Sequence, residues 1–539
     1  MGKRYLFYTF LVISICWNFK STAQVDSTNL PLFIIDTRGS HIVDEPKIEA
    51  NLKIIYNENG YTGKSDDPDI FDGNIGIEIR GRYSAMLPQK PYGFETRDSS
   101  GNNLNIPLFH MPPENDWILL ANFNDKTFMR NSLAFELFRQ MGHYAPRTQF
   151  CELILNGQYQ GIYVLTEKIK VDKNRIDIAK LTEEDNTGDD VTGGYVFKID
   201  YFNEYNSWES RHPPFESSTE QVHFVYYYPK PDEITQQQMQ YIQQFVDQME
   251  SALYKTGSQG LVNVMSDYMN LDSFVDYFLL NELARNVDGY KKSSYFYKDK
   301  NSNGGLLHAG PVWDFDWAWK NIDECIFGAT DGSGWAFAVH QCDPWPVPPG
   351  WTVKLMKDIR FRRMVKERYQ ELRQTVLSET SIFKYIDSVS YVLDDAQVRH
   401  YKRWPILGEH VGAPEVDPQP ATFEGEIDKF KNWISTRLSW LDLQFSSVIV
   451  TALEDGTKKE IAENTTCTIY PNPAQTHLYL KSDKVVHNIS LYSSKGEQIN
   501  ISYWSGLRAL DISTLPNGLY IMKNLFTDGS QWTGSFIKR

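Results

Sequence analysis

Two aspartates lie one residue apart within an aromatic run: Asp314 and Asp316 belong to GPVWDFDWAWKN, residues 310–321. Aromatic neighbours exclude water, and a dehydrated carboxylate is costly unless a positive group binds it. The longer run LLHAGPVWDFDW predicts a strand, on which residues i and i+2 point to one face, so the carboxylates would repel unless a proton or a cation joins them. Mg²⁺ or Mn²⁺ needs only one or two protein carboxylates when phosphate supplies the other oxygens. The pair is a candidate metal site, and a capped turn or a surface salt bridge is the alternative.

A third aspartate, Asp288, follows a predicted helix and precedes a predicted strand, 26 residues before Asp314. Protein kinases place a catalytic aspartate in such a loop to orient the accepting hydroxyl, and a second aspartate after a short hairpin holds the metal ion. Their catalytic loop also carries an asparagine five residues after its aspartate; here that position is Ser293, and Asn286 lies two residues before Asp288. Asp288 is therefore a candidate catalytic residue, and a turn at the helix C-terminus is the alternative.

Basic residues lie in EIRGRYSAMLPQKPYGFE, residues 78–95, which places Arg80 and Ser84 in a loop between strands and Lys90 at the next strand. Backbone N–H groups of a loop, followed by a strand lysine, can hold phosphate groups. The stretch is neither a Walker A motif nor a kinase glycine-rich loop, because it lacks their glycines. A structural hairpin is the alternative.

The N-terminus predicts export. Residues 1–23 have the basic, apolar and small-residue regions of a signal peptide, with cleavage expected after Ala23. Removing Lys3, Arg4 and Lys20 from a formal charge of −15 leaves −18, which argues against nonspecific nucleic-acid binding. No later segment reaches about 18 consecutive apolar residues, so we expect no transmembrane helix.

Four cysteines remain after Cys16 leaves with the predicted signal peptide: Cys151, Cys325, Cys342 and Cys467. No CxxC spacing occurs, so a zinc ribbon is not expected. Cys325 and Cys342 flank a loop rich in glycine, tryptophan and proline, and an oxidising compartment would allow them to form a disulfide. Buried free thiols are the alternative.

Hydrophobic patterning predicts an α+β chain. Short strand-like runs dominate residues 28–230, and apolar positions at three- and four-residue spacing dominate residues 231–445. Asn156-Gly157 marks a two-residue hairpin turn within the first region. A polar stretch, residues 451–466, predicts a linker, and strand-turn alternation over residues 467–539 predicts a small β-sandwich.

The C-terminal region resembles a known family. YPNPA, LDISTLPNGLYI and the closing FIKR are similar to the C-terminal sorting domain of the type IX secretion system in Bacteroidota. The resemblance implies passage through the periplasm, recognition by the type IX secretion machinery, and a final location that is secreted or on the outer-membrane surface. An ordinary adhesive β-domain is the alternative.

Five ordered motifs over roughly residues 30–400 resemble the spore coat protein H (CotH) kinase family: IEIRGRYS…PQKPYGFET, DWILLANFNDKTFMRNSLAFEL, LNGQYQGIYVLTEKI, NELARNVDGYKKSSYFYKD and GPVWDFDW. The resemblance implies an atypical, two-lobed protein-kinase-like catalytic domain over residues 24–450 that uses ATP with Mg²⁺ or Mn²⁺. Members in spore formers phosphorylate secreted or coat proteins on serine.

The resemblance also implies roles for individual residues. It makes Asp288 the catalytic aspartate, Asp314 a metal ligand and Asp316 a second metal ligand. The remaining expected contacts are with the nucleotide and involve Arg80, Ser84, Lys90 and Glu167. Ser293 departs from the asparagine that many members carry, which predicts a weakened or rebuilt second metal site.

The long insert at residues 325–351 is expected to cover the cleft or to form an acceptor groove. Its Trp335, Trp345 and Trp351 could stack on sugar rings. The sequence thus predicts an exported kinase that phosphorylates a hydroxyl of a secreted or surface protein, or of a glycan. The alternatives are a noncatalytic adhesion or glycan-binding protein on the same fold, and a kinase fold that transfers AMP or another group.

Overall fold

The computed structural model describes residues 24–58, 60–215, 218–257 and 260–447, and, further on, 467–482, 486–493, 498–499, 503–504, 509–526 and 531–539. The predicted signal peptide, 1–23, and the predicted linker, 451–466, lie outside these residues. The chain divides into two compact units, Met1–Ile449 and Val450–Arg539.

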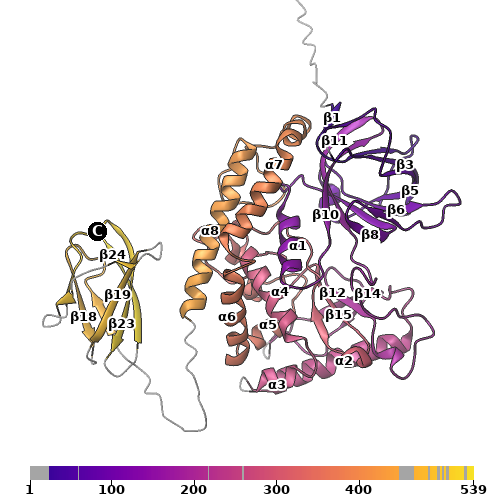
Figure 1. Ribbon diagram of the computed structural model, residues 1–539. Helices are drawn as coiled ribbons and strands as arrows, with labels where there is room; N and C mark the ends of the chain where they lie inside the picture. The colour runs from indigo at the N-terminus through magenta and orange to yellow at the C-terminus, as the bar shows by residue number, and fades with distance from the viewer. Residues whose placement is uncertain are drawn as a thin grey trace, which may run out of the picture. The chain divides into compact units, whose positions relative to one another are not determined.

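Seven strands of the first unit close into a barrel, drawn in indigo and purple in Figure 1. Six of the seven pairings are antiparallel, and β2 closes the barrel by pairing with β10 in parallel. Alternate residues of all seven strands, such as Phe33, Ile77 and Trp117, form one apolar core, as expected for side chains that point into a barrel. The strands, in barrel order, are β10 (Thr148–Leu155), β11 (Gln158–Glu167), β9 (Asp116–Ala121), β6 (Tyr92–Arg97), β5 (Phe71–Ile79), β3 (Ile48–Ile55) and β2 (Leu32–Asp36).

The predicted turn between β10 and β11 is confirmed. Asn156 and Gly157 both have positive φ, 49° and 76°, which the type I′ turn of a two-residue hairpin requires. The Asn156 side chain also accepts a hydrogen bond from the backbone N–H of Thr37 at 2.9 Å. Two small sheets accompany the barrel: β1 (Ser27–Thr28) with β4 (Thr62–Gly63), and β7 (Ile106–Leu108) with β8 (Met111–Glu114).

A second sheet of five strands joins segments that are far apart in the chain. β12 (Tyr195–Ile199) pairs with β15 (Ser294–Lys298), although about a hundred residues separate them. The strands from residues 195–228, which we expected in one region with the barrel strands, therefore pair within a sheet that also takes strands from the predicted helical region. The other members are β13 (Ser207–Glu209), β14 (His223–Tyr228) and β16 (Leu307–Ala309).

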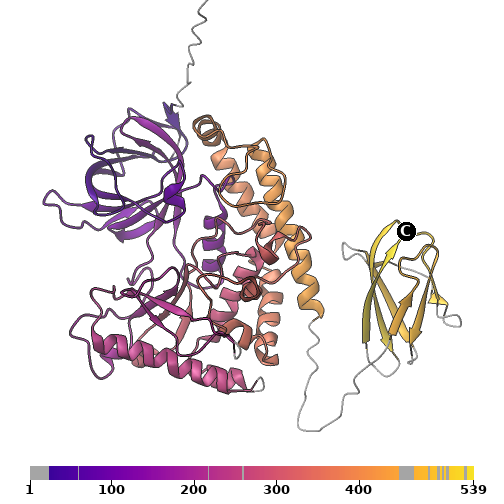
Figure 2. The same cartoon turned by 180° about the vertical axis from the view of Figure 1, so that it is seen from behind.

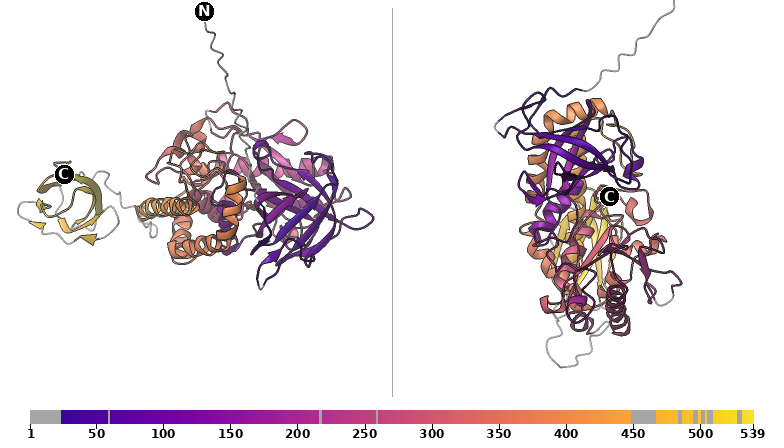
Figure 3. Two further views of the ribbon diagram at one scale, coloured as in Figure 1. Left: turned by 90° about the horizontal axis from the view of Figure 1, so that it is seen from above. Right: turned by 90° about the vertical axis from the view of Figure 1, so that its right-hand side faces the viewer.

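Helices α1, α6 and α8 pack against α4 (Leu271–Ala284), in which every residue except Asp272 is buried. The Asn270 side chain caps α4 by accepting from the backbone N–H of Ser273 at 2.9 Å. In Figure 2, α7 and α8 run side by side, and Figure 3 shows α7 against the barrel, where it contacts β11. The other α-helices are α1 (Arg130–Gln140), α2 (Gln236–Lys255), α3 (Leu261–Met265), α5 (Trp351–Leu355), α6 (Ile359–Arg373), α7 (Glu379–Arg403) and α8 (Phe423–Ser447).

The strand predicted over LLHAGPVWDFDW is wrong in its second half. β16 ends at Ala309, because Pro311 has no N–H to donate to a sheet ladder. Asp314 then takes a left-handed backbone conformation, with φ 57°, which no strand residue has. Asn131 of α1 holds this irregular segment by accepting from the backbone N–H of Phe315 at 2.7 Å.

The second unit contains two four-stranded antiparallel sheets around one apolar core, which includes Leu478, Leu491, Met522 and Phe536. This arrangement is the predicted β-sandwich. No helix among the described residues is long and apolar enough to cross a membrane. The strands are β17 (Cys467–Tyr470), β18 (His477–Ser482), β19 (Val486–Ser493), β20 (Gln498–Ile499), β21 (Tyr503–Trp504), β22 (Ala509–Asp511), β23 (Gly518–Phe526) and β24 (Gln531–Lys538).

Candidate active site

Asp314 and Asp316 form an acid pair, which is held by hydrogen bonds from two other segments. Ser293, directly before β15, donates its hydroxyl to Asp314 Oδ2 at 2.5 Å. Asn124, in the loop between β9 and α1, donates its side-chain amide to Asp316 Oδ2 at 2.7 Å. A carboxylate accepts about four hydrogen bonds, so these donors leave oxygen lone pairs for a further ligand.

The surroundings of the acid pair disfavour two negative charges. Burial, followed by the charge of Asp316, raises the pKa of Asp314 to about 7. Burial also raises the pKa of Asp316; the charge of Asp288 adds to this effect, whereas Asn124 and Lys320 oppose it. Both residues are partly exposed to solvent. The pair therefore tends to hold a proton or a cation.

Asp288 lies in the turn after α4. Its backbone N–H donates to Asn286 Oδ1 at 3.1 Å, and its carbonyl accepts from the backbone N–H of Lys292 at 2.9 Å. The Lys292 ammonium lies 3.1 Å from the Asp288 carboxylate, whose side chain is 23 % exposed. Because the charge of Asp288 contributes to the raised pKa of Asp316, the three aspartates share one electrostatic environment. The structure thus brings together the three acids that the sequence singled out.

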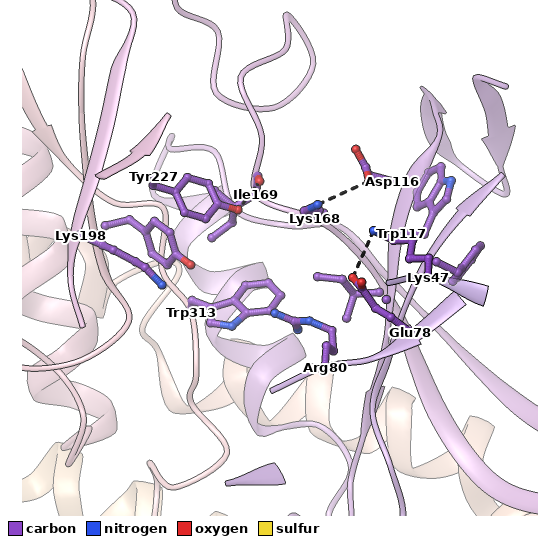
Figure 4. A pocket seen from close by; sticks show the side chains of 14 residues that line it. Lys47, Glu78, Arg80, Asp116, Trp117, Lys168, Ile169, Lys198, Tyr227 and Trp313 are labelled. Carbon is purple, nitrogen blue, oxygen red and sulfur yellow. Dashed lines mark hydrogen bonds and ion pairs between the residues drawn. The ribbon is translucent and has the colours of Figure 1, made fainter. Parts of the chain in front are cut away.

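A cavity of about 230 Å³ lies between the barrel and the five-stranded sheet (Figure 4). Barrel strands β5, β6 and β9 form one wall, and Lys198, Tyr227 and Tyr295 of the second sheet form the other. Trp313, directly before Asp314, also lines the cavity. Aromatic rings with a few charged groups are the usual lining of a small-molecule site.

Four cations line the cavity: Lys47, Arg80, Lys168 and Lys198. Figure 4 shows two of them in ion pairs across the barrel wall, Lys47 with Glu78 at 3.2 Å and Lys168 with Asp116 at 3.5 Å. The guanidinium carbon of Arg80 lies 5.5 Å from the centre of the Trp313 ring. The charge of Arg80 also opposes the rise in the pKa of Asp314, so Arg80 links the cavity to the acid pair.

The loop after Arg80 closes on itself. The Lys90 ammonium donates to the Ala85 carbonyl at 2.8 Å, and Lys90 does not belong to the described residues that line the cavity. Ser84 begins the short helix η1 (Ser84–Met86) of this loop. The Tyr83 ring meets the Trp317 ring edge-on at 5.5 Å, which places the loop over the segment that follows Asp316. Nucleotide contacts by Ser84 and Lys90 stay predictions.

Glu167 is fully buried at the end of β11 and engaged by arginine. Its carboxylate accepts from the Arg147 guanidinium at 2.8 Å and from the Arg147 backbone N–H at 2.9 Å. The next two residues, Lys168 and Ile169, line the cavity. A nucleotide contact by Glu167 stays a prediction, and its present partners give it a structural role.

The insert at residues 325–351 is closed by a disulfide between Cys325 and Cys342, with their Cα atoms 5.7 Å apart. Of its three tryptophans, Trp345 is 56 % exposed and lies 5.1 Å from the Tyr201 ring. Trp351 is buried, and Trp335 packs edge-on against Trp440 at 4.9 Å. One of the three rings is thus placed as a platform.

The acid pair can hold a divalent cation only if a bound substrate supplies further ligands. Among the described residues, no group of three or more His, Cys, Asp or Glu side chains could hold a metal ion. Asp314 and Asp316 supply two carboxylates with a raised pKa, and Mg²⁺ is often held by one or two carboxylates with substrate phosphates. The donor set therefore suits Mg²⁺ or Mn²⁺ together with phosphate.

Several polar and charged residues at the site were missed by sequence reasoning. Lys198 lies 2.6 Å from Asp200, whose charge contributes to the raised pKa of Asp314. Both come from GGYVFKIDY, a stretch that predicted only a strand. Asn124 and Asp116 lie within DWILLANFND, a motif to which no individual roles were assigned. The position of these residues inside motifs was the available signal.

Two family models match the chain. One, described as CotH kinase protein, matches residues 77–441, about two thirds of the chain. The other, described as secretion system C-terminal sorting domain, matches residues 468–539. No curated protein matches the chain. The second match, a type IX sorting domain, implies recognition by that secretion machinery and export to the cell surface or secretion.

Proposed function

The chain belongs to the CotH kinase protein family, and from this premise we propose that it is an exported atypical kinase. It transfers a phosphoryl group from ATP to a hydroxyl of a secreted or surface protein. The observation that carries the proposal is the acid pair beside a cavity lined by four cations. Negative phosphates would bind Arg80 and compete with the carboxylates that pair with the three lysines, while a divalent cation would bind the acid pair.

The proposal assigns a role to each part of a kinase-like, two-lobed domain. The barrel and the facing strands hold the nucleotide, with the adenine ring beside Tyr227 and Tyr295. The helical part presents Asp288 at the end of α4. The acceptor approaches from the side on which Asp288 is exposed.

In the transfer step, Asp288 orients the acceptor hydroxyl and takes up its proton. The hydroxyl oxygen forms a bond to the γ-phosphorus, the bond between that phosphorus and the β–γ bridging oxygen breaks, and ADP leaves. Arg80 and Lys198 stabilise the phosphate charge by electrostatic attraction. A divalent ion held by Asp314 and Asp316 would neutralise phosphate charge in the same place.

A noncatalytic glycan-binding function is the second candidate, and the exposed ring of Trp345 favours it. The ring lies beside Tyr201 and Phe202, at 5.1 and 6.1 Å between centroids. Calorimetry separates the candidates: nucleotide binding that requires Mg²⁺ or Mn²⁺ supports the kinase, whereas glycan binding without metal supports the second candidate.

Replacing Asp288 tests the kinase directly. Asp288→Asn removes the proton acceptor but keeps the side-chain size, so we expect turnover to fall by about 10² to 10⁴. Nucleotide affinity should stay within about threefold, because Asp288 acts on the acceptor. The measurement is transfer of labelled γ-phosphate to a dephosphorylated mixture of secreted bacterial proteins, with nucleotide binding by calorimetry. Labelling that survives the substitution removes Asp288 from the mechanism.

Two substitutions test which cationic side chain binds the nucleotide phosphates. Arg80→Met should weaken nucleotide binding by about tenfold, since it removes a charge that faces both the cavity and Asp314. Lys90→Met should change binding by less than about twofold, because the Lys90 ammonium is bound to the Ala85 carbonyl. Equal losses in the two variants would restore Lys90 to the phosphate site.

A further inference from the structure

A buried polar cluster connects the turn that carries Asp288 to the disulfide-closed insert. It consists of Glu282 and Arg285 at the end of α4 and Arg437 of α8, each at most 1 % exposed. None of the three lines the cavity described above. Buried charges of this kind are costly unless they are fully bonded, so their partners show what they hold in place.

Arg285 is bonded to the segment that follows the acid pair. Its guanidinium donates to the side-chain oxygen of Asn321 at 2.5 Å and to the Phe327 carbonyl at 2.9 Å. It also donates to the carbonyls of Ala329 and Ser333 at 2.9 and 2.7 Å. One rigid, forked side chain therefore holds four points between residues 321 and 333.

Glu282 and Arg437 bind the adjacent part of the insert. The Glu282 carboxylate accepts from the backbone N–H groups of Ala336 and Phe337, both at 2.7 Å. Arg437 donates to the carbonyls of Gly332 and Gly334 at 2.7 and 2.6 Å. The insert segment 332–337 is thus held on both sides by side chains of α4 and α8.

The turn with Asp288 is attached to the same insert. Arg285 has a left-handed backbone, with φ 41°, and begins this turn three residues before Asp288. Lys291, three residues after Asp288, lies 2.8 Å from the Glu324 carboxylate, directly before Cys325. The insert and the residue directly before it therefore contact the turn on both sides of Asp288.

The disulfide closes this insert. Cys325 is the first residue of η4 (Cys325–Gly328), and Cys342 is the last residue of η5 (Ala336–Cys342). All of the insert residues that bond Glu282 and Arg437, and three of the five hydrogen-bond partners of Arg285, lie between the two cysteines. Cys325 is exposed to solvent, so a thiol reagent can reach the bond. Opening a closed loop restores conformational freedom to the segment that it held.

We propose that Arg285 is a positioning residue for phosphoryl transfer, and that its hydrogen bonds to the insert depend on the disulfide between Cys325 and Cys342. The inference rests on the proposed function and adds regulation to the same site. Arg285 fixes the position of Asp288 relative to the acid pair. It begins the turn that carries Asp288, and its guanidinium donates hydrogen bonds to the segment that follows Asp316 in the chain. The arrangement is completed after export, where an oxidising compartment allows the disulfide to form.

The redox step is thiol–disulfide exchange. A dithiol reductant breaks the Cys325–Cys342 bond by supplying two electrons and two protons, and is itself oxidised to a cyclic disulfide. The products on the protein are two thiols. Removal of the reductant and exposure to an oxidised dithiol reverses the exchange.

Two measurements test the proposal on the purified full chain. On reduction, turnover should fall by about 100-fold, the scale expected for a misplacement of about 1 Å, whereas the affinity for ATP with Mg²⁺ should stay within about threefold. Hydrogen exchange of the amides in residues 286–292 should accelerate by at least about tenfold, and reoxidation should restore both values.

Variants separate positioning from general stability. Arg285→Lys keeps the charge but loses the fork, so it should lower turnover by about 100-fold with little change in the KM for ATP. Arg211→Lys, at an exposed pair with Asp247, is the matched control and should leave turnover unchanged. Cys325→Ser with Cys342→Ser should behave like the reduced chain, and Cys151→Ser should not. If Arg285→Lys is not recovered folded, the reduced wild-type chain carries the same test.

The outcomes distinguish the two proposals. Equal turnover and equal exchange in the oxidised and reduced chains overturn the inference and leave the kinase intact. Loss of nucleotide binding together with turnover on reduction also overturns it, because the disulfide would then support the whole domain. An oxidised chain that transfers no phosphoryl group rejects the kinase, while the exchange data still decide whether the insert positions Asp288.

Discussion

Two groups of charged side chains lie a few residues apart in the chain, and they differ in the signs of the charges that they bring together. The acid pair places two like charges together. The second group, which we term the ion-pair cluster, places opposite charges together: Lys320 lies 3.0 Å from Glu415, and Lys126 lies 2.9 Å from Glu426. The complete ion-pair cluster consists of Asp125, Lys126, Arg130, Lys320, Glu415, Glu426 and Lys429.

The pKa directions of the two groups show the difference. Burial raises the pKa of Glu415, but the charges of Lys320, Arg130 and Lys429 outweigh it and hold that pKa well below its usual range. In the acid pair, burial and the neighbouring carboxylate act together and raise the pKa of Asp314. Each carboxylate of the ion-pair cluster has a cationic partner within the protein, whereas the acid pair needs a positive partner from outside. A buried pair of like charges costs free energy of folding, and such an arrangement indicates a binding site.

The largest expected effect is that of Asp314→Asn. Phosphoryl transfer should fall by about 10³-fold or more, because the variant lacks a carboxylate that we propose as a ligand of the metal ion. In buffer with chelator at pH 8, the free energy of unfolding should rise by about 1 kcal/mol or more, since like-charge repulsion is removed. Initial rates and urea unfolding measure the two quantities. A variant that is both inactive and less stable would show that the acid pair is a structural element.

The next effect is that of Lys320→Met in the ion-pair cluster. It leaves Glu415 buried with less compensation and removes the donor to the Asn124 carbonyl, so the free energy of unfolding should fall by about 3 kcal/mol or more. The matched control is Lys431→Met at the exposed pair with Asp387, which should cost less than about 1 kcal/mol. Similar losses in both variants would show that the ion-pair cluster is no more stabilising than a surface pair.

Local patterns in the sequence predicted much of the fold. The apolar residues of α4, the Asn156-Gly157 turn and the strands of the C-terminal sandwich all appear where their patterns indicate them. The pairing of β12 with β15 could not be predicted in this way, because a strand's own residues do not specify a partner about a hundred residues away. Lys198 and Asp200 reach the site only through this pairing.

Sequence reasoning singled out the acids of the candidate site and Arg80, but not the three lysines that line the cavity. Residue types and motif order singled out Asp288, Asp314 and Asp316, and the structure gathers them even though the expected strand stops at Ala309. Lys90 has a suitable place in the sequence, but the direction of its side chain is decided by the Ala85 carbonyl. Side-chain direction depends on contacts that spacing alone does not contain.

The last expected effect is a pH dependence that separates the acid pair from the ion-pair cluster. The pKa of Asp314 is about 7 in the fold, against an ordinary value of 3.8, so the folded chain keeps a proton that the unfolded chain has lost. Stability without divalent metal should therefore decline as pH rises from about 4 to about 7, by about 1 kcal/mol per pH unit from this group.

Mg²⁺ competes with that proton, so its stabilising effect should be larger at pH 8 than at pH 5.5. Thermal unfolding with Mg²⁺ and a nonhydrolysable ATP analogue, at both pH values, measures the difference. Asp314→Asn should abolish it, and Lys320→Met, which leaves both acids in place, should retain it. Equal stabilisation at the two pH values would mean that the cation binds away from Asp314, and the contrast between the acid pair and the ion-pair cluster would no longer identify the site.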